Sequence, residues 1–212
     1  MFYLVRAPWI LQQYYWECIW KIKTKEKKIY LTFDDGPTPG ITEFVLDELE
    51  RFNAKATFFC IGENVEKEPT LFNEITRRGH SVGNHSYTHL NGWKTDNEKY
   101  LKDISRAARL INSKLFRPPY GRATKFQLYN IIYGKSLQLK PVMWHVLSAD
   151  FDTRISPEQC FLNVINNSKE GSLVVFHDSE KAFPNLKDSL PRVLAYYIEK
   201  GFSFEKLDDS AA

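Results

Sequence analysis

Residues 29–61, IYLTFDDGPTPGITEFVLDELERFNAKATFFCI, predict a strand, a helix and a second strand in succession. The apolar run Ile29–Phe33 is typical of a buried strand. Apolar residues then recur at helical spacing over Ile41–Phe52, and a second strand-like run follows at Ala56–Ile61. This alternation indicates parallel strands joined by a crossover helix.

The rest of the chain continues the same alternation. Further strands are expected at 81–83, 115–117, 141–146, 173–176 and 202–204, and further helices at 69–79, 98–112, 125–136, 157–166 and 186–200. Neither an internal repeat nor a long linker interrupts the series. The sequence therefore predicts one α/β domain with a parallel sheet, either open or closed into a barrel.

Composition narrows the class of protein. The chain has 212 residues, of which 43% are hydrophobic and 26% charged, as expected for one folded domain with a sizeable core. A net charge of +3 is too small to indicate a nucleic-acid partner. The cysteines Cys18, Cys60 and Cys160 are odd in number and irregularly spaced, which excludes a disulfide framework. Aromatic residues make up 15%, which favours core packing, with sugar stacking as the alternative.

Residues 1–28 differ from the rest, and we treat them as an N-terminal unit before a main domain at 29–207. The segment from Phe2 to Trp20 is apolar but interrupted by Arg6 and Glu17. It fits neither a signal peptide nor a transmembrane span, so we expect a cytoplasmic protein or one held at the cell envelope by another route.

We expect Pro8 to open a short aromatic helix that packs on one end of the domain. A weak contact between this helix and a membrane interface is the alternative. The basic stretch 21–28 is interpreted as a solvated linker, and binding to an anionic polymer or membrane is the alternative there.

Polar residues gather where the predicted strands end. They are Asp34, Asp35, His85, His89, Arg117, Asp150 and His177. In an α/β barrel the C-terminal ends of the strands form the active-site face. The convergence of seven such residues at that end predicts a single catalytic site.

Asp35, His85 and His89 offer three ligands for a divalent metal ion, with Asp34 left over as a candidate base. We expect the two histidines on a helical turn, where residues four apart share one face. The alternative for the two aspartates is a solvated turn without catalytic function.

Arg117 precedes two prolines in Arg117–Gly121, a sequence that predicts a rigid loop. Its guanidinium suits the clamping of a carboxylate, and nearby backbone N–H groups suit a developing oxyanion. His177 is a candidate proton donor held by Asp150. A surface arginine and a structural core histidine are the alternatives.

These motifs together resemble the polysaccharide deacetylases with a NodB homology domain, carbohydrate esterase family 4. The resemblance rests on TFDDGP at 32–37, HSYTH at 85–89, RPPYG at 117–121 and LVVFHD at 173–178. It implies a distorted (β/α) barrel of about seven parallel strands. It also implies hydrolytic removal of N-acetyl groups from N-acetylglucosamine-containing glycans, such as peptidoglycan or chitin oligomers.

The resemblance further implies a role for each residue. Asp34 would be the general base, oriented by Arg117, and His177 the general acid. Asp35, His85 and His89 would hold zinc, with cobalt or nickel as substitutes. The backbone N–H of Tyr120 would contribute to the oxyanion hole.

The fourth family motif is altered. Phe151 stands after Asp150 where the family usually has tryptophan, and Asp152 nearby leaves two carboxylates that could tune His177. Two alternative functions stay open: an amide or ester hydrolase for a small molecule, and a non-catalytic glycan-binding domain.

Overall fold

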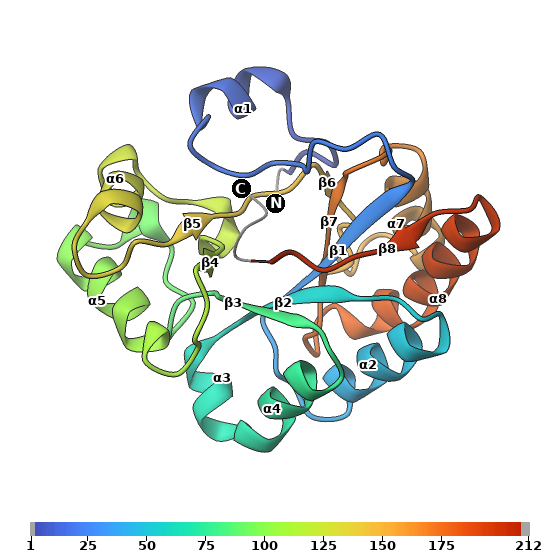
Figure 1. Ribbon diagram of the computed structural model, residues 1–212, viewed down its shortest axis with the longest axis horizontal. Helices are drawn as coiled ribbons and strands as arrows, with labels where there is room; N and C mark the ends of the chain where they lie inside the picture. Colours follow the sequence, from blue (N-terminus) through green and yellow to red (C-terminus); the bar gives the residue numbers. More distant parts are fainter. Residues whose placement is uncertain (1–2, 209–212) are drawn as a thin grey trace.

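The computed structural model describes residues 3–208 and is built around a curled sheet of parallel strands (Figure 1). The neighbouring strands follow the order β5-β4-β3-β2-β1-β7-β6, and β8 pairs with the start of β1. The described strands are β1 Lys28–Asp34, β2 Ala56–Cys60, β3 Ser81–Asn84, β4 Leu115–Phe116, β5 Lys140–Pro141, β6 Val146–Leu147, β7 Leu173–His177 and β8 Ser203–Phe204. The distorted (β/α) barrel expected from the sequence is confirmed.

Helices surround this sheet (Figure 1). They are α1 Trp9–Tyr14, α2 Ile41–Arg51, α3 Gly62–Lys67, α4 Pro69–Arg77, α5 Asn97–Ala108, α6 Lys125–Tyr133, α7 Pro157–Ile165 and α8 Phe183–Glu199, with 3-10 turns at Gly92–Lys94 and Pro119–Gly121. The sequence did not predict α3, because six residues are too few to display a helical period. Stacked rings of Phe58, Phe33 and Phe176, from β2, β1 and β7, lie in the core.

The single strand expected at 141–146 was wrong. The amide of Val142 donates to the Phe116 carbonyl beside β4, whereas the amide of His145 donates to the Leu173 carbonyl at the start of β7. This stretch therefore crosses from one edge of the curled sheet to the other, and only its two ends form short strands. An apolar run does not reveal such a change of partner, because both ends are equally buried.

The N-terminal segment fills the opening between those two edges. The Leu147 amide donates to the Val5 carbonyl at 2.8 Å, and Ile19 pairs with Val142. Trp20 is buried, but α1 buries none of its side chains and projects from the body (Figure 1). The first two residues of the expected 1–28 unit lie outside the described residues. Among residues 3–208, no helix has the length and hydropathy needed to cross a bilayer.

Candidate active site and metal centre

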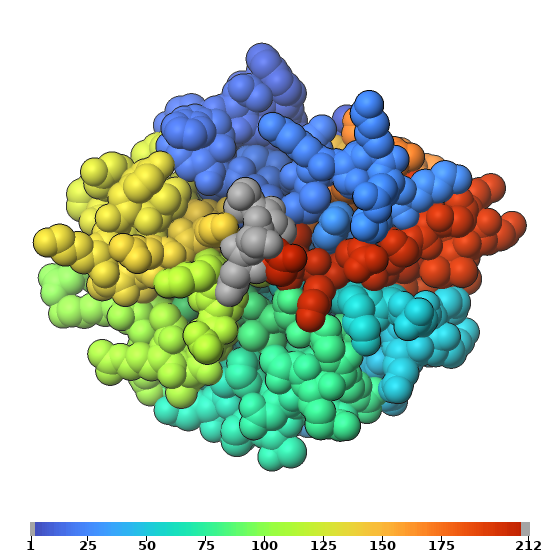
Figure 2. Space-filling view, viewed as in Figure 1, coloured from blue at the N-terminus to red at the C-terminus, as the bar shows by residue number. Residues whose placement is uncertain are grey.

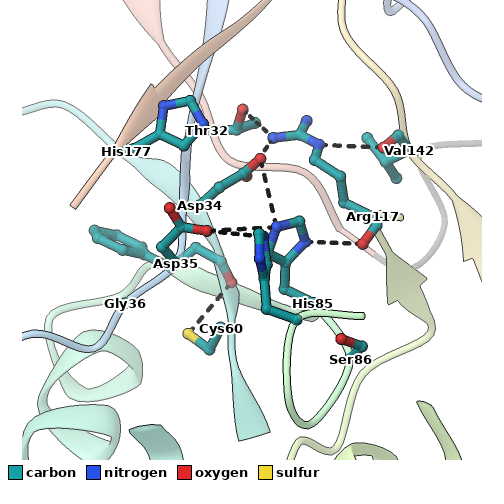
Figure 3. A network of polar contacts seen from close by, with 12 residues as sticks. Thr32, Asp34, Asp35, Gly36, Cys60, His85, Ser86, Arg117, Val142 and His177 are labelled. Carbon is teal, nitrogen blue, oxygen red and sulfur yellow. Dashed lines mark hydrogen bonds and ion pairs between the residues drawn. The ribbon is translucent and has the colours of Figure 1, made fainter. Parts of the chain in front are cut away.

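The carboxylates of Asp34 and Asp35 face the same site because the backbone turns sharply between them (Figure 3). Alternation along a strand would send neighbouring side chains to opposite faces. At the end of β1, however, Asp35 adopts the left-handed conformation with φ 84°. The Asn64 side-chain amide fixes this turn by donating to the Asp35 carbonyl at 2.7 Å.

Asp178 holds the next residue of the turn. It accepts hydrogen bonds from the Gly36 amide at 3.1 Å and from the Thr42 hydroxyl at 2.6 Å. A Cβ atom on Gly36 would lie 2.0 Å from Asp178 Oδ2, so only glycine fits there. Burial and the charge of Asp35 raise the pKa of Asp178 to about 8. Sequence reasoning missed Asp178 and Asn64, and only the adjacency of Asp178 to His177 gave any signal.

The two histidines lie on a loop, so the expected helical turn was wrong. Ser86 and His89 both have positive φ values, 62° and 57°, which no helix accommodates. Asp103 on α5 stabilises the loop by accepting from the amides of Tyr87 and Thr88 at 2.8 and 3.0 Å. A contact across fifteen residues or more therefore replaces the local helical geometry that the spacing suggested.

The loop nevertheless brings both imidazoles to Asp35. Oδ1 of Asp35 lies 3.6 Å from His85 Nε2 and 3.3 Å from His89 Nε2. Ligand atoms of one tetrahedral zinc ion, each about 2.1 Å from it, would be about 3.4 Å apart. Asp35 Oδ1 is also buried and has no hydrogen-bond partner among the described residues. These three residues form a group that fits a divalent cation.

The protonation states of the two histidines suit the same interpretation. His85 Nδ1 lies 2.8 Å from the Arg117 carbonyl, an acceptor, so its proton sits on Nδ1 and its Nε2 lone pair faces Asp35. Burial and the neighbouring His85 lower the pKa of His89 to about 4. The lowered pKa leaves the His89 imidazole neutral near pH 7, and the Nε2 atoms of both histidines face Asp35.

Arg117 is fully buried and bonds Asp34 at 2.7 Å between Nη1 and Oδ1 (Figure 3). The guanidinium also donates to the Thr32 hydroxyl and to the carbonyls of Val142 and Met143. Burial alone would raise the pKa of Asp34, but the charges of Arg117, His85 and His177 and the hydrogen bond from Arg117 together outweigh burial and lower the pKa. Asp34 is thus a fixed, ionised carboxylate beside the candidate metal ligands.

His177 ends β7, in register with Asp34 on β1. Asp150 Oδ1 lies 2.8 Å from His177 Nδ1, and Asp150 Oδ2 accepts from the His177 amide at 2.7 Å. Burial disfavours the imidazolium, but the charge and hydrogen bond of Asp150 raise the pKa of His177 to about 9. Asp152 instead pairs with Arg154 at 2.7 Å. The carboxylate that tunes His177 is therefore Asp150.

Tyr120 lies at the mouth of the site. Its backbone is left-handed, with φ 59°, and its ring packs 4.6 Å from that of His89. An open cavity of about 430 Å³ includes two of the candidate metal ligands, Asp35 and His89, in its lining. Pro37, Asn64 and Ser179 also line it. The site has room for a substrate larger than one acyl group.

Comparison with protein families agrees with this geometry. Residues 21–131 match the family model described as polysaccharide deacetylase. The chain belongs to the polysaccharide deacetylase family. The matched region contains the turn after β1, the histidine loop and Arg117, so it includes all three candidate metal ligands.

Curated relatives of this polysaccharide deacetylase have related activities. A peptidoglycan-N-acetylglucosamine deacetylase of Bacillus cereus is 33% identical over 85% of this chain and 66% of its own length. A second peptidoglycan-N-acetylglucosamine deacetylase of that organism is 31% identical over 87% of this chain and 88% of its own length. A chitooligosaccharide deacetylase of Azorhizobium caulinodans is 32% identical over 74% of this chain and 77% of its own length. The chain thus spans about two thirds of the first relative and most of the other two.

Solved structures have the same fold. A peptidoglycan N-acetylglucosamine deacetylase, crystallised with a substituted N-hydroxybenzamide, superposes with a TM-score of 0.83 at 31% identity over 95% of both chains. A family 4 pseudoenzyme of Bacillus anthracis superposes with a TM-score of 0.75 at 22% identity, over 89% of this chain and 66% of the other. The second likeness concerns the fold alone, so the activity of this deacetylase must be argued from its site residues.

Proposed function

We propose that this chain removes N-acetyl groups from an N-acetylglucosamine-containing glycan and releases acetate. The observation that carries the proposal is the cluster of Asp35, His85 and His89, flanked by an arginine-held carboxylate and an aspartate-held imidazole. The substrate class follows the relatives, which are named as deacetylases of peptidoglycan and of chitooligosaccharides.

Asp35, His85 and His89 would hold the metal ion, and zinc suits their nitrogen and oxygen donors, with cobalt or nickel as substitutes. Such an ion supplies Lewis acidity toward water and the amide carbonyl. Asp34, kept in place by Arg117, accepts a proton from the attacking water.

The remaining residues stabilise the tetrahedral state and its collapse. The Tyr120 backbone N–H donates to the developing oxyanion. The His177 imidazolium, oriented by Asp150, gives its proton to the departing amine nitrogen as the carbon–nitrogen bond breaks. Water and amide are thereby converted to acetate and a free amino sugar.

Acetate release tests the function directly. Purified, metal-loaded protein should release acetate from peptidoglycan fragments or chitin oligomers, and a chelator should slow the reaction by at least about a hundredfold. Added zinc should restore the rate. Release from small amides or esters but not from glycans would favour a small-molecule hydrolase, and glycan binding without release would favour a non-catalytic domain.

The pH profile tests the role of His177. Only the imidazolium can donate a proton, so kcat/KM should fall as pH rises through the His177 pKa of about 9. Asp150→Asn removes the charge that raises this pKa, and should move the basic limb to lower pH by about 1 to 3 units. Asp188→Asn on α8, whose side chain is exposed, is the control. An unmoved basic limb in folded Asp150→Asn protein would contradict the assignment.

We also propose that the N-terminal helix contacts a membrane surface. Trp9 and Trp16 are each 70% exposed, and Lys21, Lys23 and Lys25 are exposed in the segment that follows. Figure 2 shows the N-terminal segment, coloured blue, along one edge of the molecule. Aromatic side chains suit the headgroup layer, and adjacent lysines complement anionic lipids.

Co-sedimentation with vesicles tests this contact. The protein should bind phosphatidylcholine vesicles that contain phosphatidylglycerol more strongly than vesicles of phosphatidylcholine alone. The double variant Trp9→Ser/Trp16→Ser should lose at least about tenfold in affinity. Trp93→Ser is the matched control, since Trp93 is 58% exposed elsewhere. Equal vesicle binding by the double variant and the Trp93 variant would contradict the membrane contact. A protein that dimerises but does not bind vesicles would contradict it as well.

A further inference from the structure

The N-terminal segment reaches the active-site face. Residues 5–7 run antiparallel to β6, with Arg6 opposite Val146. Because β6 is parallel to β7, which ends at His177, the chain from Ala7 back toward Tyr3 follows β6 to its C-terminal end. Tyr3 therefore lies on the face that carries the catalytic residues, although it is 174 positions from His177 in the sequence.

Tyr3 contacts the residue that packs against the proposed acid. Its ring meets the ring of Phe151 edge-on, with centroids 5.4 Å apart and an interplanar angle of 71°. Phe151 in turn meets the His177 imidazole edge-on at 5.1 Å and 79°. The three rings form a continuous row that ends on the acid.

Polar contacts fix the Tyr3 side chain and the backbone around Phe151. The Tyr3 hydroxyl donates to Asp152 Oδ2 at 2.9 Å, and Asp152 is itself held by Arg154. The Asn185 side chain donates to the carbonyls of Asp150 and Asp152 at 3.0 and 3.2 Å. The backbone on both sides of Phe151 is thus anchored, whereas its ring depends on its neighbours for position.

A further neighbour of the Phe151 ring, Lys181, supplies little restraint. Lys181 Nζ lies 5.8 Å from the ring centroid, and the lysine side chain is long and exposed. Tyr3 is a rigid ring with its hydroxyl tied down, so it restricts the motion of Phe151 far more.

We propose that Tyr3 is a positioning residue for the deacetylation: it holds Phe151 against His177 and so keeps the imidazole aimed at the leaving nitrogen. This inference rests on the proposed function of His177. It makes the N-terminal segment part of the active-site wall. Phe151 is smaller than the tryptophan that is usual at this motif, and the Tyr3 ring would fill the space that the smaller ring leaves.

A double-mutant cycle tests the proposal. Tyr3→Ala should lower kcat by about 3- to 10-fold with little change in KM, as expected for the loss of one edge-to-face aromatic pair. In a Phe151→Ala background the same change should have almost no further effect. Tyr3→Phe keeps the ring and should recover most of the rate. Leu4→Ala, at a neighbouring exposed side chain, is the control and should behave as wild type.

Imidazole NMR separates this proposal from the proposed function, because it needs no turnover. Tyr3→Ala should shift the ring resonances of His177 but not those of His80, which is buried beside β2. Unshifted His177 resonances, or a Tyr3→Ala loss that is as large without Phe151 as with it, would overturn the proposal. If the wild-type protein releases no acetate but Tyr3→Ala still shifts the His177 resonances, the proposed function is refuted and the contact between Tyr3, Phe151 and His177 stands.

Discussion

Asp34→Asn is expected to reduce acetate release by about 10²- to 10⁴-fold while the protein stays folded and keeps its metal. The amide retains an oxygen that can accept from Arg117, and the guanidinium keeps its bonds to Thr32, Val142 and Met143. The substitution therefore removes the proton acceptor with little change of shape. Acetate assays on the metal-loaded variant measure the effect.

The neighbouring carboxylate provides the matched comparison. Asp35→Asn should also abolish activity, but through loss of metal, because Asp35 Oδ1 lies between the two histidine nitrogens. Metal analysis after dialysis should find the ion in Asp34→Asn and little or none in Asp35→Asn. Wild-type turnover by Asp34→Asn would remove this residue from the role of base, and equal metal content in both variants would remove Asp35 from the ligands.

Arg117→Met is expected to have the largest effect on stability, about 3 to 5 kcal/mol, because it leaves the buried Asp34 carboxylate without its partner. The melting temperature should fall by about 6 to 20 °C. The arginine lowers the pKa of Asp34, so its contribution is complete at neutral pH and diminishes as acid protonates the carboxylate. The deficit of the variant should therefore shrink at low pH.

Arg77→Met is the control for that measurement. Arg77 also pairs with a carboxylate, Glu74, but its side chain is 72% exposed. Water screens such a pair, so the substitution should change the free energy of unfolding by less than about 0.5 kcal/mol. Similar melting temperatures for the Arg77 and Arg117 variants would show that burial does not give the Asp34–Arg117 pair its importance.

Much of the fold followed from local patterns. The runs at β1, β2 and β7 and the periodic segments at α2 and α7 agree with the predicted elements within one or two residues. These elements are long or strongly patterned, so their period is visible without tertiary information. The short elements α3, β5 and β6 were missed or merged, because two to six residues carry no period.

The proximity of four candidate site residues was predictable from the sequence, but their geometry was not. Asp34, Asp35, His85 and His89 follow strands whose C-terminal ends meet at one face, so their proximity followed from topology. Their orientation did not. The histidine loop adopts positive φ values where a helical turn was expected, since Asp103 on a separate helix satisfies its amides.

The sequence by itself determined that this is an α/β protein, which residue types face the active-site end, and the family to which they belong. Those features depend on periodicity, strand ends and short motifs, all of which are local. Only the tertiary structure decided that Asp35 turns toward the histidines, that Asp150 rather than Asp152 holds His177, and that Tyr3 closes the wall beside Phe151. Each of these depends on contacts between residues 27 to 149 positions apart, which no local pattern encodes.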